Sequence, residues 1–306
     1  MLLGLVRRLV YLAVPLLLIF SAARCGPAPA SPIIVFCSPD SPRMQQAIEG
    51  LRAGLGQENL EVVCVPELGG QGGEELRRVR QRRPRLLVAL GAPALIRVAP
   101  VEKRTPVVFG LVANPYFTGA AYDPARPEIH KANITGVASP PPLDAALEQG
   151  AGLLPRTWGL LYDPHDGVSV DLKDRFLKEA PSYGLRPLAL PADSQAADRR
   201  GLEKLMARGA RVIYLPPAPS AARYAPLLLS WGRERRVMVV SGHPEFQQGA
   251  ILRVTLDYRK LGGEIATLAR WVLAGEAPDK IPVVEKTPLK IEADEGLLRR
   301  WSVYRG

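Results

Sequence analysis

Short apolar runs alternate with amphipathic stretches along most of this chain. The runs are rich in β-branched residues and bounded by turn formers, which predicts buried strands. The expected strands are 33–36, 61–65, 85–90, 106–112, 157–162, 186–190, 211–215, 237–240 and 250–256. Between the runs, apolar residues recur at helical spacing, as at Met44, Ile48, Leu51 and Leu55. The pattern therefore predicts strands and helices in regular alternation.

The alternation falls into two series, which predicts two Rossmann-like lobes of the α/β class with mostly parallel sheets. A proline-rich join at 130–142 suits a passage between lobes. A second passage is expected near 253–258, because the last amphipathic stripe, 261–272, adds one more helix to the first lobe. The predicted organisation is a leader over 1–30, a first lobe over 31–135 plus about 257–277, a second lobe over 136–256 plus about 278–292, and a C-terminal helix or tail over 293–306.

The N-terminus has the layout of a secretory signal peptide. Arg7 and Arg8 precede an apolar run over 9–20, and small residues follow. The run is short for a bilayer, which takes roughly 20 apolar residues to span, so a cleaved leader is expected, with an uncleaved anchor as the alternative. Two processing routes stay open: lipid attachment at Cys25, or ordinary cleavage after the A-x-A sequence at 28–30. Either route predicts a bacterial protein that works in the periplasm or elsewhere outside the cytoplasm.

The charge balance is basic, at +10 over 306 residues. A chain beginning at Ser31 loses Arg7, Arg8 and Arg24 and keeps +7. The basic residues are scattered except for one dense run at 77–85, which lies on a predicted helix and its exit. Export argues against a nucleic-acid partner, and a modest attraction to anionic lipid headgroups is expected instead. We expect a monomer.

Cysteine usage agrees with export. Without Cys25, the pair Cys37 and Cys64 remains, an even number in an oxidising compartment. The two residues lie near the ends of the first two predicted strands, which are neighbours in a doubly wound sheet. A cross-strand disulfide is therefore predicted, with two buried thiols as the alternative.

Catalytic and metal-binding patterns are missing from the sequence. His130, His165 and His243 do not have the spacing of a helical zinc pair. The cluster of Asp163, His165 and Asp166 follows a strand and is typical of capping and turn residues. No G-x-S-x-G elbow is present. We therefore expect no metal, no cofactor and no enzymatic activity.

Small and polar residues follow the ends of the predicted strands, where open α/β sheets bind ligands. The candidate contacts are Gly91, Pro93, Asn114, Ser139, Asp163, Pro217, His243, Glu245 and Asp257. For an amino acid, backbone amides and a hydroxyl would hold the carboxylate, and Asp257 or Asp163 would pair with the ammonium.

Four segments, 91–94, 106–115, 133–137 and 238–262, together resemble the ABC-transporter substrate-binding proteins of the tryptophan/tyrosine-binding kind. The resemblance covers about 33–288. It implies a type I periplasmic-binding-protein fold, in which two lobes joined by several crossings close around a small molecule and present it to an ABC permease in the inner membrane. The alternative is an accessory or sensory ligand-binding protein that serves no permease.

The sequence departs from these relatives at three places. Asn114 stands where they usually have an acidic residue, Ala92 where they have threonine, and Pro217 with Ala218 where they have threonine and aspartate. Shorter or neutral side chains replace polar ones at each place. The expected ligand is therefore amino-acid-like or less polar.

Overall fold

The computed structural model describes residues 31–37, 41–65 and 70–301, so the predicted leader with Cys25 lies outside the described residues. The first lobe contains a parallel sheet in the order β2-β1-β3-β4-β5. Its strands are β1 (Ile33–Cys37), β2 (Leu60–Cys64), β3 (Leu86–Leu90), β4 (Val107–Val112) and β5 (Ile134–Ala138). The first four lie within one residue of their predicted positions. The pattern did not single out β5, which forms one edge of the sheet.

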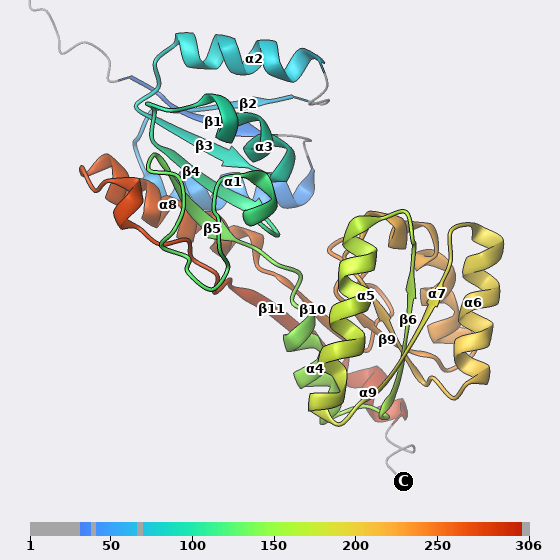
Figure 1. The fold of residues 1–306 in the computed structure, drawn as a ribbon. Helices are drawn as coiled ribbons and strands as arrows, with labels where there is room; N and C mark the ends of the chain where they lie inside the picture. Colours follow the sequence, from blue (N-terminus) through green and yellow to red (C-terminus); the bar gives the residue numbers. More distant parts are fainter. Residues whose placement is uncertain (1–30, 38–40, 66–69, 302–306) are drawn as a thin grey trace, which may run out of the picture. The chain divides into compact units, whose positions relative to one another are not determined.

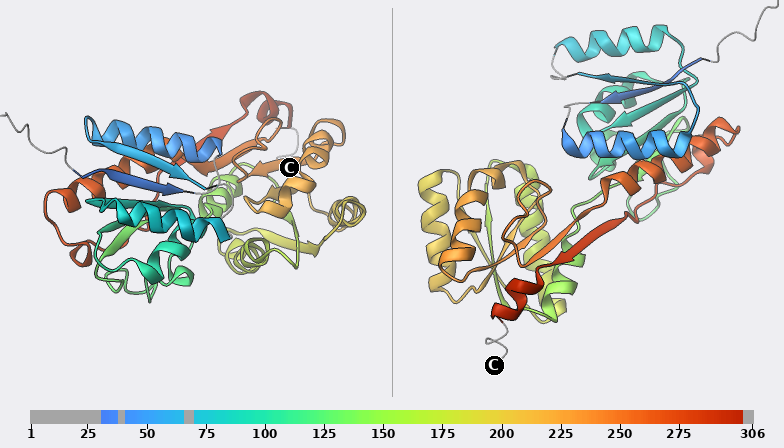
Figure 2. Two further views of the ribbon diagram at one scale, coloured as in Figure 1. Left: turned by 90° about the horizontal axis from the view of Figure 1, so that it is seen from above. Right: turned by 180° about the vertical axis from the view of Figure 1, so that it is seen from behind.

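Helices cover both faces of this sheet (Figures 1 and 2). They are α1 (Pro42–Leu55), α2 (Gly70–Gln81), α3 (Ala92–Val101) and α8 (Tyr258–Leu273). Successive β1 side chains point to opposite faces. Ile33 and Val35 join the apolar core with α1 and α8, whereas Ile34 and Phe36 join the core with α2 and α3. The lobe is thus a three-layer α/β/α arrangement.

Glycines bring α1 and α8 into close contact. A Cβ atom on Gly50 would collide with the carbonyl oxygen of Arg259, and one on Gly262 would collide with the carbonyl oxygen of Ala47. Only a residue without a side chain allows the two backbones to approach this closely. Helix α8, which follows a strand of the second sheet, is held on the first lobe in this way.

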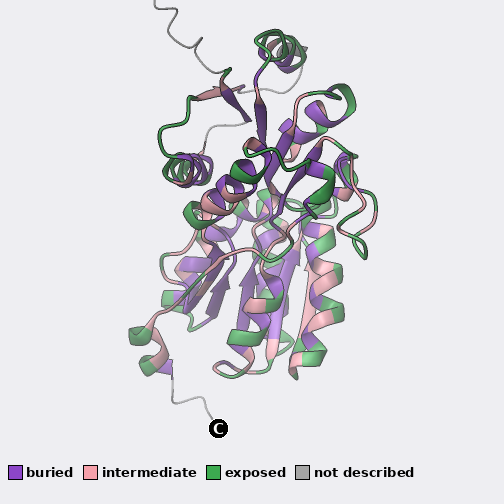
Figure 3. Ribbon diagram, turned by 90° about the vertical axis from the view of Figure 1, so that its left-hand side faces the viewer, coloured by how far each residue is buried: buried purple, intermediate pink, exposed green. Residues whose placement is uncertain are grey.

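The second lobe has a six-stranded sheet in the order β11-β10-β9-β8-β6-β7, in which β11 alone is antiparallel to its neighbour. Its strands are β6 (Thr157–Tyr162), β7 (Arg186–Pro191), β8 (Val212–Leu215), β9 (Met238–Ser241), β10 (Leu252–Leu256) and β11 (Leu289–Ala293). The inner strands β6, β8, β9 and β10 are mostly buried, whereas the edge strands β7 and β11 are partly exposed. The helices that cover the sheet bury only their inner sides (Figure 3). Trp158, Tyr214 and Phe176 are fully buried in this core.

The helices of the second lobe are α4 (Leu143–Ala151), α5 (Gly167–Glu179), α6 (Gln195–Ala207), α7 (Ala225–Glu234) and α9 (Glu295–Trp301). Short 3-10 turns complete the two lobes: η1 (Tyr116–Thr118), η2 (Ala180–Tyr183), η3 (Pro219–Arg223) and η4 (Pro278–Lys280). Within the described residues, no helix has both the length and the apolar character that a membrane span requires.

The described chain passes between the two sheets three times: after β5, between β10 and α8, and before β11. The first sheet extends to Ala138, beyond the predicted lobe limit of 135. Ile281 and Val283 lie in the cores of the first lobe, and Val284 pairs with Val137. Because these apolar side chains are buried there, the first lobe takes in the start of the 278–292 segment that was predicted for the second, and only β11 joins the second sheet.

Cys37 and Cys64 form a disulfide across the first two strands. The two residues are direct partners in the parallel register of β1 and β2, and their Cα atoms lie 4.5 Å apart. The bond ties β2, which forms an edge of the sheet, to the buried strand beside it.

Candidate functional site

The nine candidate contacts all follow the carboxyl ends of strands, but the structure does not gather them in one cavity. A cavity of about 200 Å³ lies where α1, the β9–β10 loop, α8 and β11 meet. It is lined by Pro42, Arg43, Gln46, Pro244, Glu245, Gln247, Thr255, Leu256, Tyr258 and Lys290. Glu245 is the one candidate contact in this lining. Both lobes and the β10–α8 crossing contribute to it.

Arg43 of α1 interacts with Tyr258 at the start of α8 and with His243 in the loop after β9. It stands in the first turn of α1, whose start is set by Ser41 and Pro42. Burial raises the pKa of the Tyr258 hydroxyl, and the guanidinium of Arg43, which shares a hydrogen bond with it, opposes this rise. The hydroxyl therefore stays protonated at neutral pH and is available as a donor.

The loop after β9 presents His243 beside this cavity. The Oγ of Ser241 donates to the carbonyl of Phe246 at 2.7 Å and accepts from the amide of His243 at 3.2 Å. The Nδ1 of His243 accepts from the amide of Glu245 at 3.2 Å, and its ring packs against Phe246. Burial lowers the pKa of His243, with Glu245 opposing and Arg43 assisting. The imidazole is therefore neutral at pH 7, with its proton on Nε2.

Asp163 is engaged in a network inside the second lobe. Its Oδ1 accepts from the amide of His165 at 2.9 Å, and its Oδ2 accepts from Nη1 of Arg223 at 3.0 Å. Arg223 also donates to both carboxylate oxygens of Asp198, at 2.7 and 3.1 Å, and to the carbonyl of Ala192. The amide of His165, with help from Arg223 and against the effect of burial, lowers the pKa of the Asp163 carboxyl.

Asp257 caps α8. Its Oδ1 accepts from the amide of Lys260 at 3.0 Å, and Oδ2 lies 3.4 Å from the ammonium of the same residue. Asp257 stands between Leu256 and Tyr258, which line the cavity, but is not itself in the lining. Helix capping therefore occupies the carboxylate that the sequence suggested for an ammonium group.

The other candidates have local roles in the structure. The Oδ1 of Asn114 accepts from the amide of Tyr116 at 3.0 Å. Ser139 is buried, and its amide donates to the carbonyl of Val112. Gly91 has a φ of 93°, a left-handed value that favours glycine, in the turn between β3 and α3. Pro217 packs near Gly242, and Pro93 borders a separate groove between α2 and α3.

Among the charged groups, the sequence reading missed Arg43 and Lys290, which line the cavity, and Arg223, which pairs with Asp163. Arg43 follows the first strand and stands next to a clear helix start, so the strand-end rule could have identified it. Lys290 and Arg223 carry no local signal, because Lys290 enters the cavity lining, and Arg223 reaches Asp163 and Asp198, only through the packing of distant segments.

Comparison with known families decides what kind of protein this is. The sequence model of the family described as ABC transporter substrate binding protein matches residues 33–293. The chain belongs to this family of ABC transporter substrate-binding proteins. The predicted resemblance is thus confirmed. No curated protein matches the sequence.

Solved structures show the same fold for this substrate-binding protein. A conserved domain protein from Vibrio cholerae O1 biovar El Tor is 19% identical, with 89% of this chain and 94% of that one covered and a TM-score of 0.68. The ABC domain of Streptococcus pneumoniae in complex with L-Trp is 20% identical, with 88% and 94% covered and a TM-score of 0.66. A substrate-binding protein with adhesive properties from Clostridium difficile, in its ligand-free, open structure, is 20% identical, with 88% and 94% covered and a TM-score of 0.75. The predicted type I periplasmic-binding-protein fold is confirmed.

Membership of this family has direct consequences. Substrate-binding proteins of ABC transporters act outside the cytoplasm, take a small molecule as ligand and have an ABC transporter as partner. The family is one of binding proteins and is not catalytic. Among the described residues, no group of three or more His, Cys, Asp or Glu side chains is placed to hold a metal ion.

We expect the two roles suggested for Asp257 in this substrate-binding protein to be separable by two variants. Asp257→Ala removes the cap of α8 and should lower the free energy of unfolding by about 1 kcal/mol, whereas Asp257→Asn keeps a capping side chain and should leave it nearly unchanged. Urea unfolding measures both. If Asp257 also pairs with a ligand ammonium, Asp257→Asn should weaken binding by roughly 30-fold without loss of stability. Unchanged affinity would leave Asp257 as a helix cap alone.

Proposed function

We propose that this protein captures a small carboxylate-bearing molecule in the cavity beside Arg43 and delivers it to an ABC importer. The observation that carries the proposal is the lining of that cavity, which combines α1, the loop after β9, β11 and the β10–α8 crossing. Movement of the lobes about the crossings would change the shape of a cavity built in this way. Binding and hinge closure would then be linked.

The charges in the cavity favour a carboxylate. Arg43 and Lys290 are cationic, and the exposed Glu245 is the acidic residue in the lining. A guanidinium binds a carboxylate through two parallel hydrogen bonds, which are among the stronger ones in proteins. Lys290 already has Glu292 within 3.2 Å, so Arg43 is the better placed cation. The Tyr258 hydroxyl and the amides of the two glutamines in the lining, Gln46 and Gln247, supply further polar contacts.

The ammonium group of a ligand would find fewer available partners than its carboxylate, because the two predicted aspartates are already engaged. Asp163 is committed to Arg223, and Asp257 caps α8. The neutral residues Ala92 and Pro217 replace polar ones of the relatives, which supports a ligand that is amino-acid-like or less polar. The remaining candidate contacts, Gly91, Asn114, Ser139, Pro217 and His243, stay predicted contacts at strand ends outside the lining of this cavity, and Pro93, which borders the separate groove between α2 and α3, stays an untested one. We also propose that the protein is an exported, non-catalytic monomer, with lipid attachment at Cys25 or cleavage after residue 30 as its two processing routes.

Calorimetric measurement of ligand binding to a variant of Arg43 tests whether the bound molecule carries a carboxylate. The retained small molecule is first identified by native mass spectrometry of protein purified from its own cells, and L-tryptophan, the ligand in the Streptococcus pneumoniae structure, is tested with it. Arg43→Gln should weaken binding of a carboxylate ligand by about 10- to 100-fold, because a hydrogen bond to a charged group contributes about 1.5–3 kcal/mol. Arg52→Gln is the control, since Arg52 is exposed on the same helix but outside the cavity.

Three results would count against the proposal. They are unchanged affinity in Arg43→Gln, an equal loss in Arg52→Gln, or a retained molecule without an acidic group. Delivery to a permease is tested separately, by measuring uptake of the retained molecule in cells with and without this protein. Normal uptake in its absence would favour the accessory or sensory role.

A further inference from the structure

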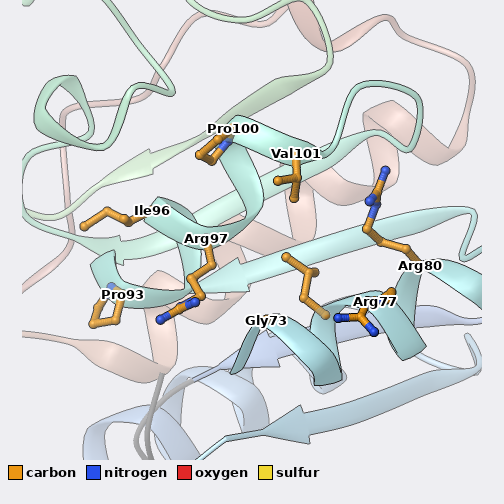
Figure 4. A pocket seen from close by; sticks show the side chains of 9 residues that line it. Gly73, Arg77, Arg80, Pro93, Ile96, Arg97, Pro100 and Val101 are labelled. Carbon is orange, nitrogen blue, oxygen red and sulfur yellow. The ribbon is translucent and has the colours of Figure 1, made fainter. Parts of the chain in front are cut away.

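A groove lies between α2 and α3 on the first lobe, separate from the cavity beside Arg43 (Figure 4). It has a volume of about 630 Å³. Its lining is made of Gly73, Leu76, Arg77, Arg80, Pro93, Ile96, Arg97, Pro100 and Val101. The lining contains aliphatic, proline and arginine side chains and no aromatic one. Substrate binding does not account for this combination.

Aliphatic side chains of the groove are open to solvent. Ile96 is 51% exposed and Val101 is 45% exposed, and both lie on the outer side of α3. Pro93 and Pro100 are exposed beside them. Residues of this kind gathered on one helix face indicate a surface that is covered in some state of the protein.

Positive charge is concentrated in the segment that contains α2 and α3. Residues 70–105 contain nine Lys or Arg and three Asp or Glu, in a chain whose whole net charge is +10. Arg82 and Arg85, which follow the end of α2, pair with Glu61 and Glu58 of the neighbouring segment. These pairs neutralise the two arginines that follow the helix, whereas the groove itself is lined by three arginines, Arg77, Arg80 and Arg97, and by no acidic residue.

The arginines of the groove differ in how they are held. Arg80 pairs with the buried Glu102 at 2.9 Å, whereas Arg77 has only a loose, exposed contact with Glu74 at 3.8 Å. Arg97 has no acidic partner within 4.0 Å among the described residues. Its Nη1 lies 3.7 Å from the position that a Cβ atom on Gly73 would occupy. Arg97, and Arg77 once its loose contact with Glu74 is released, are therefore available to bind an anion outside the protein.

We propose that this α2–α3 groove binds the anionic lipid surface of a membrane. Arg77 and Arg97 would contact lipid phosphates, to which guanidinium groups donate two parallel hydrogen bonds, and Ile96 and Val101 would enter the interface between headgroups and acyl chains. Cations around exposed aliphatic residues suit a surface that is negatively charged outside and apolar beneath. The absence of aromatic residues from the lining argues against single-stranded nucleic acid, which stacks on such residues.

Vesicle co-sedimentation tests the proposal. The full mature protein is mixed with vesicles of phosphatidylglycerol and phosphatidylcholine in equal parts, or of phosphatidylcholine alone. Binding is expected to the anionic vesicles only and should decrease as salt is added. The double variant Arg77→Gln/Arg97→Gln should partition about 25-fold less, because each basic residue near an anionic surface contributes about fivefold. The matched control Arg200→Gln/Lys204→Gln removes two exposed charges from α6 and should bind as the wild type does.

A further variant separates insertion from charge attraction. Ile96→Ser should bind anionic vesicles several-fold more weakly at unchanged net charge, with the fold checked by circular dichroism. The proposal is overturned if the wild type does not bind anionic vesicles or if the control loses as much binding as the groove variant. It is also overturned if a photo-reactive residue at position 96 cross-links to another protein in membranes and not to lipid.

Discussion

Replacing Arg223 by methionine is expected to lower the free energy of unfolding by about 3–5 kcal/mol. Arg223 is the shared partner of Asp163 and Asp198, whose side chains are 10% and 2% exposed. Methionine fills much of the same space but leaves two carboxylates without their cation, and an uncompensated buried charge is costly. Urea unfolding measures the change. Arg259→Met is the control, because its ion pair with Glu49 is exposed and should contribute at most about 1 kcal/mol.

The dependence of the unfolding free energy on pH in the acid range provides a second measure of the ion pairs that Arg223 forms with Asp163 and Asp198. The pKa of Asp163 is lowered by the His165 amide and by Arg223, so its contribution is fully present above the unfolded value of about 3.9. That contribution is lost as the pH falls through the lower, folded value. Arg223→Met removes one cause of the lowering, so unfolding free energy should decrease less steeply below about pH 4. A stability change within 1 kcal/mol, or an unchanged acid profile, would show that the network does not stabilise the lobe.

Replacing Gly262 by alanine is expected to cost about 3 kcal/mol or more. The new methyl group would overlap the carbonyl oxygen of Ala47 and approach the amide nitrogen of Leu51, both in the α1 backbone. Because neither atom belongs to a flexible side chain, α1 and α8 must move apart, and the apolar contacts between them are weakened. Differential scanning calorimetry and urea unfolding both measure this loss.

The adjacent residue offers a matched control. Gly263 lies in the same helix, and a Cβ atom there would meet nothing within 4 Å. Gly263→Ala should therefore stabilise the protein by up to about 1 kcal/mol through the higher helix propensity of alanine. If Gly262→Ala and Gly263→Ala behaved alike, close packing of α1 on α8 would not be what requires glycine at position 262.

The order of strands and helices could be predicted because its signals are local. Apolar runs such as Leu86–Leu90 are buried on both faces in a parallel sheet, so they read as continuous hydrophobic stretches. Helix starts such as Ser41 with Pro42 depend on hydrogen bonds and dihedral angles of adjacent residues. The register of Cys37 beside Cys64 likewise follows once β1 and β2 are neighbours. Local chemistry thus determined the elements and the two-lobe α/β class.

The membership of the candidate site was decided by the tertiary structure. Strand ends gave the correct edge of each sheet, but they did not show that Arg223 would reach Asp163 from 60 residues away, or that Asp257 would cap α8. Arg43 and Lys290 meet in one cavity only because α1 packs in the first lobe while β11 returns to the second. Side-chain partners at such separations depend on how whole elements pack, and periodicity carries no information about that. The sequence by itself therefore determined the helices, the strands and the two-lobe α/β class. The tertiary structure determined which charged side chains remain available to bind a ligand.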